Sequence, residues 1–101
     1  MQHDLFVNPN RRERLGFPFI VLLQAEVAEG DYRIVAPLTI VTARTPIARV
    51  MPIVEHDGQN YVVLFNLMTN LPSRFLRRPV GSIAQYRDDL TRALDWLFFG
   101  I

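Results

Sequence analysis

The sequence predicts a mainly β (α+β) domain in which an antiparallel sheet of about five strands precedes a single C-terminal helix. Short apolar runs separated by single Pro and Gly residues are typical of strands joined by turns. The pair Asp57-Gly58 lies between two of these runs and readily adopts the positive φ angles of a tight hairpin turn. The last stretch instead repeats its apolar residues with the period of a helix.

Composition limits the class of protein. A chain of 101 residues is long enough for one domain and too short to divide into two, and its 50% apolar content indicates a packed core. Cysteine is absent, which excludes disulfides, thiolate metal sites and thiol catalysis and predicts a reducing, cytoplasmic location. All eleven basic residues are arginine, and the net charge of +1 predicts no strong general attraction to nucleic acid or membranes.

The predicted strands follow one another along the chain. They span Gln2–Val7, Phe17–Glu26, Tyr32–Ile40, Ala48–Glu55 and Tyr61–Leu67, with a shorter irregular piece from Ser73 to Pro79. The Asp57-Gly58 turn pairs the fourth strand with the fifth. The apolar run Phe17 to Leu23 contains Pro18 and is too short to cross a bilayer, so we interpret it as a buried strand.

A helix is predicted from about Ile83 to Phe99. Ser82 and Gln85 have the spacing of a capping box, in which the hydroxyl accepts from the amide three residues later. Arg92 is placed to meet Asp88 and Asp95 on the solvent side. The core stripe should contain Ile83, Leu90, Leu94, Leu97 and Ile101, with Ala93 and Phe98 on its flanks.

Two aromatic residues at the end of this helix fall outside the core stripe. At about 100° per residue, Phe99 lies roughly 160° from the stripe and Trp96 roughly 140° away on the other flank. Large apolar rings on a polar face indicate a surface for another protein. Three alternatives stay open: a frayed terminus bends Phe99 back, a strand covers Trp96, or both rings lie in a homodimer interface.

The stretch Ala93 to Ile101, with the letters ALDWLFFGI, closely resembles the ending of CcdB toxins, whose apolar helix stops in aromatic-Gly-Ile. Other segments resemble the family in the same order: Met1-Gln2, Val21 to Glu26, Arg33 to Leu38, Met51 to Val54 with Gly58, and Met68 to Pro72. The resemblance covers nearly the whole chain. It implies a partly barrel-like antiparallel sheet of the CcdB/SH3-like type and a homodimer whose two helix ends lie near the symmetry axis.

The resemblance also implies a function. The chain would be the toxin of a type II toxin-antitoxin system, a poison of a topoisomerase and not an enzyme. It would bind the gyrase A subunit and trap gyrase on cleaved DNA. Phe99 would stack on a gyrase arginine, Gly100 and Ile101 would complete the contact and Asp95 would border it. The best-known members carry Trp at the position of Phe99 and Asn at that of Asp95, and Trp96 is positioned to compensate.

Further binding residues and partners follow from the same resemblance. Gln2 and the strand end from Ala25 to Val27 are weaker candidates for the gyrase contact. A cognate antitoxin with a disordered tail would fold along the dimer and compete with gyrase. The toxin-antitoxin complex would bind its own promoter DNA. The phosphate-contacting candidates are Arg11, Arg12, Arg14, Arg74, Arg77 and Arg78.

Two other functions remain open at this point. A ribonuclease of the related small-barrel class would use His56, Glu55 and Arg49 as acid, base and phosphate ligand. A family member without toxicity would keep only the dimer and antitoxin binding. We expect His3 only to decorate the first strand, and the scattered His and carboxylate residues predict no metal site or cofactor.

Overall fold

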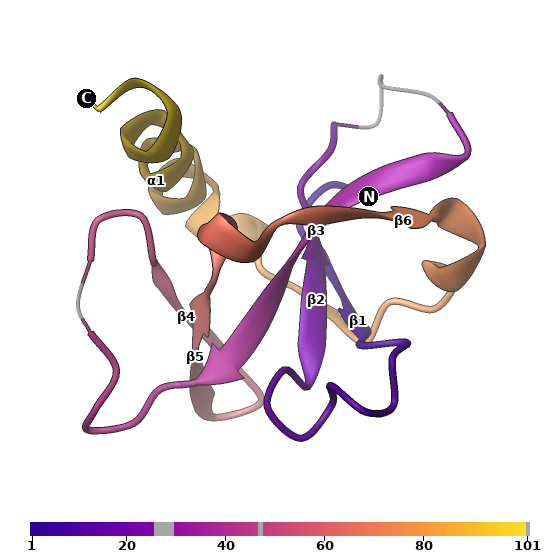
Figure 1. The fold of residues 1–101 in the computed structure, drawn as a ribbon, viewed down its shortest axis with the longest axis horizontal. Helices are drawn as coiled ribbons and strands as arrows, with labels where there is room; N and C mark the ends of the chain where they lie inside the picture. Colours follow the sequence, from indigo (N-terminus) through magenta and orange to yellow (C-terminus); the bar gives the residue numbers. More distant parts are fainter. Residues whose placement is uncertain (26–29, 47, 101) are drawn as a thin grey trace.

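A computed structural model of the chain describes residues 1–25, 30–46 and 48–100. Within these residues one antiparallel sheet has the strand order β4-β5-β3-β2-β1-β7, and β6 pairs with β3 (Figure 1). The sheet curves into a nearly closed barrel with one C-terminal helix, which confirms the predicted fold class. The elements are β1 (Asp4–Val7), β2 (Phe19–Leu22), β3 (Tyr32–Ile40), β4 (Ile53–His56), β5 (Gln59–Val63), β6 (Thr69–Pro72), β7 (Gly81–Ser82) and α1 (Arg87–Phe99).

All five predicted strands are present. Strand β3 has the predicted bounds, and the bounds of the other four are shifted. The predicted strand piece from Ser73 to Pro79 is wrong, because Ser73–Phe75 form a 3-10 turn. The sequence analysis missed β6 and β7, which flank this region. Both are held by long-range pairing, β6 with β3 and β7 with β1, and this pairing leaves no local pattern in the sequence.

Strand β3 organises the sheet because one of its edges serves two partners. Its first half pairs with β6, with Val35 opposite Thr69, and its second half pairs with β5, with Leu38 opposite Val63. Between these two pairings, the carbonyl of Pro37 accepts a hydrogen bond from the Leu64 amide at 2.9 Å. The other edge of β3 pairs with β2. The β4–β5 hairpin therefore diverges from β6 and forms a separate arm below α1 (Figure 1).

The alternation of side chains across the strands produces two apolar clusters, one on each face of the sheet. Leu5 and Val21 belong to the cluster that packs against the helix, whereas their neighbours Phe6 and Ile20 belong to the other. The two-residue period of a strand explains this division. The first cluster includes Leu90 and Ala93 of α1, and the second is covered by Leu71 and Leu76.

The predicted hairpin turn is confirmed. Asp57 and Gly58 both have positive φ, 50° and 76°, and β4 pairs with β5 up to the closing pair of His56 and Gln59. Two central residues with positive φ match the twist of the flanking strands.

The helix begins later than predicted. Residues Ala84–Tyr86 form a 3-10 turn, and α1 starts at Arg87. Ser82 accepts from the amide of Ala84 at 3.2 Å, one residue short of the capping-box bond, because Ser82 is held in β7 opposite Asp4. The hydroxyl of Tyr86 accepts from the Glu55 amide at 3.0 Å and ties this turn to β4.

The face of the helix that was predicted to be buried is confirmed in its first half. Ile83, Leu90 and Ala93 are buried, and Leu94 and Leu97 pack partly against the same cluster. Phe98 departs from the prediction, since it is 64% exposed. The helix has passed beyond the sheet at this point, so no strand covers its flank (Figure 1). Ile101 lies outside the described residues.

Candidate functional site

The C-terminal end of α1 carries an exposed aromatic pair, Phe98 and Phe99. Phe99 is the last helical residue and is 73% exposed, so its ring lies outside the fold as the helical projection predicts. The helix is held by Leu90 and Ala93 on the other side, roughly two turns earlier. Because this anchor is rigid and the tip is free, the two rings form an apolar projection that a partner can reach.

Gly100 ends the helix. Its φ of 71° is left-handed, and its amide donates to the carbonyl of Trp96 at 3.1 Å. This is the usual C-terminal arrangement in which glycine avoids the strain of a side chain at positive φ. A Cβ atom here would meet nothing within 4 Å, so the conformation and not a clash requires glycine. The turn at Gly100 stops the helix directly after Phe99.

Trp96 is less available than the sequence predicts. It is partly buried, and the guanidinium of Arg49 lies 4.3 Å from its ring centroid. The indole lines a groove together with Arg49 and Pro52. The segment before β4 therefore covers one face of the ring. The alternative left open by the sequence was cover by a strand, whereas Arg49 lies in a turn before β4. No local pattern indicates this contact, because Arg49 and Trp96 are far apart in the chain.

The charged residues of the helix differ in their pairing from the prediction. Arg92 pairs with Asp89 at 3.4 Å, not with Asp88 or Asp95. All four residues are exposed, so several pairings three or four positions apart are accessible to the arginine. Asp95 makes no ion pair with any described residue and borders the exposed tip.

The remaining predicted contact residues lie elsewhere in the same chain. The Gln2 side chain donates to the carbonyl of Leu23 at 2.9 Å, and Ala25 is exposed two residues further on. Val27 lies outside the described residues. The two chain ends are well separated in Figure 1.

Comparison with known protein families identifies the family to which the chain belongs. The model of the CcdB protein matches residues 2–100. The chain belongs to the CcdB family. A comparison with curated proteins found no match. CcdB proteins are toxins of toxin-antitoxin systems. The resemblance seen in the sequence is therefore confirmed over nearly the whole chain.

The three residues considered for a ribonuclease site have separate surroundings in this CcdB-family fold. His56 packs edge-on against Phe19, with ring centroids 5.2 Å apart and 10% of its side chain exposed. Glu55 precedes it on β4 and is exposed, as alternation requires. Arg49 contacts Trp96. In the pocket that Arg49 lines, the described lining residues do not include His56 or Glu55.

His3 has a structural place that the sequence analysis did not foresee. It is buried, precedes β1 and has a φ of 70°, so the expectation that it decorates the first strand is wrong. Its amide donates to the Leu22 carbonyl and its carbonyl accepts from the Ile83 amide, which joins β2 to the start of the helical region. Burial lowers the pKa of His3, and the nearby positive charge of Arg87 lowers it further.

Other features of the CcdB-family chain bear on partners. Among the described residues, no group of three His, Cys, Asp or Glu side chains could hold a metal ion. The search for a helix long and apolar enough to cross a membrane found none among the described residues. The arginines considered for phosphate contacts are all exposed: Arg11, Arg12, Arg14, Arg74, Arg77 and Arg78.

Proposed function

We propose that this CcdB-family chain binds the gyrase A subunit through the tip of α1 and traps gyrase on cleaved DNA. The observation that carries the proposal is the 73% exposure of Phe99 at a helix end fixed by Gly100. A rigid aromatic side chain loses little conformational freedom on binding and is a frequent anchor of protein interfaces. Membership of the CcdB family supports gyrase as the target.

The contact consists of the tip and its border. Phe99 stacks on an arginine of gyrase, where a cation-π contact contributes about 0.5 to 2 kcal/mol depending on desolvation. Gly100 and Ile101 complete the apolar contact, while Asp95 and Trp96 border it. Gln2, Ala25 and Val27 form a weaker, secondary contact with gyrase.

The mechanism is a shift of population and not catalysis. A ligand changes a conformational equilibrium only by its difference in affinity for the two states. The toxin therefore traps gyrase because the tip fits the open, DNA-cleaving conformation better than the closed one. No residue of the toxin needs to act as a nucleophile, acid or base.

The proposed partners follow from this role. The toxin is a cytoplasmic homodimer, and a cognate antitoxin neutralises it by folding a disordered tail along the dimer. In the toxin-antitoxin complex, the six exposed arginines named above contact promoter phosphates and so contribute to autoregulation of transcription.

Expression of the intact chain beside a form lacking residues 99–101 tests the proposal. Growth, supercoiling by purified gyrase and binding to the gyrase A subunit are scored. The truncated form is expected to lose all three effects, as is Phe99→Ala, whereas Phe75→Ala, which removes another exposed aromatic ring, keeps them. Equal behaviour of intact and truncated chains would contradict the proposal.

Two additional assays of the pure protein, antitoxin binding and RNA cleavage, separate the alternatives. Antitoxin binding without any effect on gyrase identifies a non-toxic family member. RNA cleavage by the pure protein that is abolished by His56→Ala identifies a ribonuclease.

A further inference from the structure

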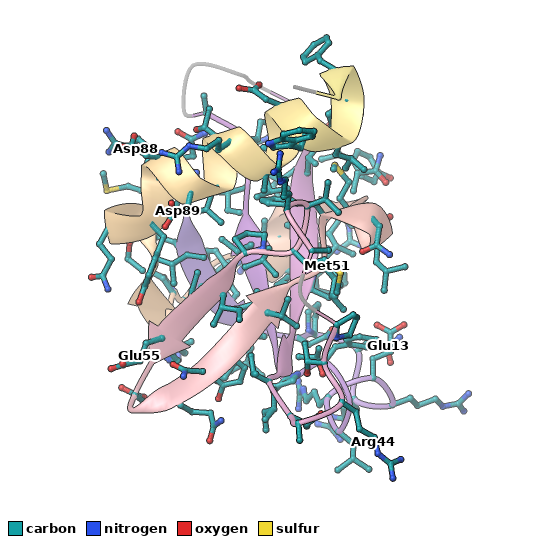
Figure 2. All side chains as sticks on the ribbon, turned by 90° about the vertical axis from the view of Figure 1, so that its left-hand side faces the viewer. Glu13, Arg44, Met51, Glu55, Asp88 and Asp89 are labelled. Atoms are coloured by element: carbon teal, nitrogen blue, oxygen red, sulfur yellow. The ribbon has the colours of Figure 1, made fainter. Side chains whose placement is uncertain are left out.

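A groove of about 450 Å³ lies between α1 and the segment that leads into β4. Figure 2 shows α1 crossing above the β4–β5 arm, with Asp89 on the side of the arm, Asp88 on the other side and Met51 below the helix. The groove lies on this lower side, where Asp89, Arg92 and Trp96 of the helix line it. It is large enough for a few side chains of a partner and too small for more.

One wall of the groove holds Arg49, which forms no ion pair within the described part of the chain. The guanidinium of Arg49 lies over the Trp96 ring at 4.3 Å, and it pairs with none of the carboxylates of the described residues. Stacking on an indole orients the planar guanidinium and leaves the N–H donors at its edge free. The guanidinium of Arg49 is therefore oriented so that it can donate hydrogen bonds to an anion.

The other wall carries a weak ion pair. Arg92 and Asp89 approach to 3.4 Å, and both side chains are more than half exposed, at 68% and 56%. Among the described residues, two guanidinium groups and one carboxylate line the groove, which gives this lining a net charge of +1. This balance suits a single carboxylate. A run of phosphates would place several negative charges beside Asp89, which disfavours a nucleic acid.

The floor of the groove is apolar. Pro52 and Ile53 line it, and Ile53 is 45% exposed. An apolar side chain that covers Ile53 removes this surface from water. The groove therefore combines a receptor for one carboxylate with an adjoining apolar surface.

We propose that this groove binds a segment of a partner protein that carries a carboxylate next to apolar side chains. The carboxylate lies between Arg49 and Arg92 and accepts hydrogen bonds from the Arg49 edge, while the apolar neighbour covers Ile53. The inference does not rest on gyrase as the target: the groove shares Trp96 with the border of the proposed gyrase contact, but its anion receptor, Arg49, is not part of that contact. Phe99→Ala should leave binding at the groove unchanged.

The single tryptophan of the chain gives a direct measurement. A short peptide with both ends blocked, carrying Asp-Leu-Leu within a Gly-Ser sequence, is titrated into the full chain while Trp96 fluorescence is followed. We expect a saturable change that weakens with added salt. The same peptide with Asn in place of Asp, and a short oligothymidylate, are expected to bind at least roughly tenfold more weakly.

Variants locate the binding at Arg49. Arg49→Gln should lower the affinity for the Asp peptide by roughly tenfold or more, and Arg49→Lys should do so less. Arg44→Gln is the matched control, because Arg44 is exposed and lies at the bottom of Figure 2, at the opposite end of the molecule from α1. Circular dichroism of each variant checks the fold.

Four results would overturn the proposal. The first is an affinity for the Asn peptide equal to that for the Asp peptide, and the second is a higher affinity for the oligothymidylate. The third is an equal loss of affinity for the Asp peptide in Arg49→Gln and Arg44→Gln. The fourth is that the chain binds no peptide and instead self-associates in a way that depends on Arg49. The second result would identify a nucleic-acid site. The last, measured by sedimentation, would identify the groove as an interface between two copies.

Discussion

The imidazole of His56 occupies the space that a side chain at position 81 would need. A Cβ atom on Gly81 would lie 2.5 Å from Cε1 of His56 and 2.9 Å from its Nδ1. The ring cannot withdraw easily, because it packs edge-on against Phe19 and is nearly buried. This contact joins the end of β4 to β7 across the barrel, and it gives His56 a packing role.

Gly81→Ala should therefore destabilise the protein by about 1 to 3 kcal/mol through overpacking. Urea unfolding measures the change. Gly16→Ala is the control, since no atom lies within 4 Å of its added Cβ, and a change within about 0.5 kcal/mol is expected there. Because His56→Ala removes the ring that the new Cβ would meet, the double variant Gly81→Ala/His56→Ala should lose less free energy of unfolding than the two single variants lose together. A Gly81→Ala protein as stable as the parent would contradict this account.

Tyr86→Phe should lower the free energy of unfolding by about 0.5 to 1.5 kcal/mol, because the Glu55 amide loses the hydroxyl that accepts its hydrogen bond. Thermal or urea unfolding provides the measurement. Tyr32→Phe, at a side chain that is 58% exposed, should change stability by less than about 0.5 kcal/mol. Equal effects of the two substitutions would show that the hydroxyl of Tyr86 does not anchor the turn before α1.

The stability of the protein should fall in acid through His3. Burial, aided by Arg87, lowers the pKa of His3 in the folded state below the ordinary value of about 6.5. Above that pH the ring is neutral in both states and contributes no pH dependence. Below it the unfolded chain binds a proton that the folded chain does not, so the free energy of unfolding decreases with falling pH.

His3→Asn should reduce this slope below pH 6.5, since asparagine does not titrate and tolerates the positive φ at position 3. Urea unfolding at several pH values gives the comparison. An unchanged slope in the variant would assign the acid sensitivity to other groups.

Phe99→Trp should bind the gyrase A subunit more tightly, by roughly fivefold, because the larger indole face gives a stronger cation-π contact. Phe99 is exposed, so the free energy of unfolding should change by less than about 0.5 kcal/mol. Calorimetric titration measures the affinity, and Phe75→Trp controls for the addition of an indole elsewhere. If Trp96 compensates for Phe99, Trp96→Ala should weaken binding. Unchanged affinity in both Phe99→Trp and Trp96→Ala would reject this role for the aromatic residues.

The sequence by itself determined the class of fold, the central strand, the hairpin turn and the exposure of Phe99. These depend on local rules: the two-residue period of strands, the positive φ of Asp57-Gly58 and the helical projection of the last turn. Family membership also followed from ordered sequence segments. The local features depend only on neighbouring residues, and the family resemblance depends only on the order of segments along the chain, so both can be read from the sequence.

The tertiary structure alone decided the rest. Strands β6 and β7 exist because distant strands pair with them, and the helix starts late because Ser82 is held in that pairing. Trp96 is covered by Arg49, and Phe98 is exposed because the helix extends past the sheet. These outcomes depend on which segments meet in space. Such contacts between residues far apart in the chain leave no periodic signal in the sequence.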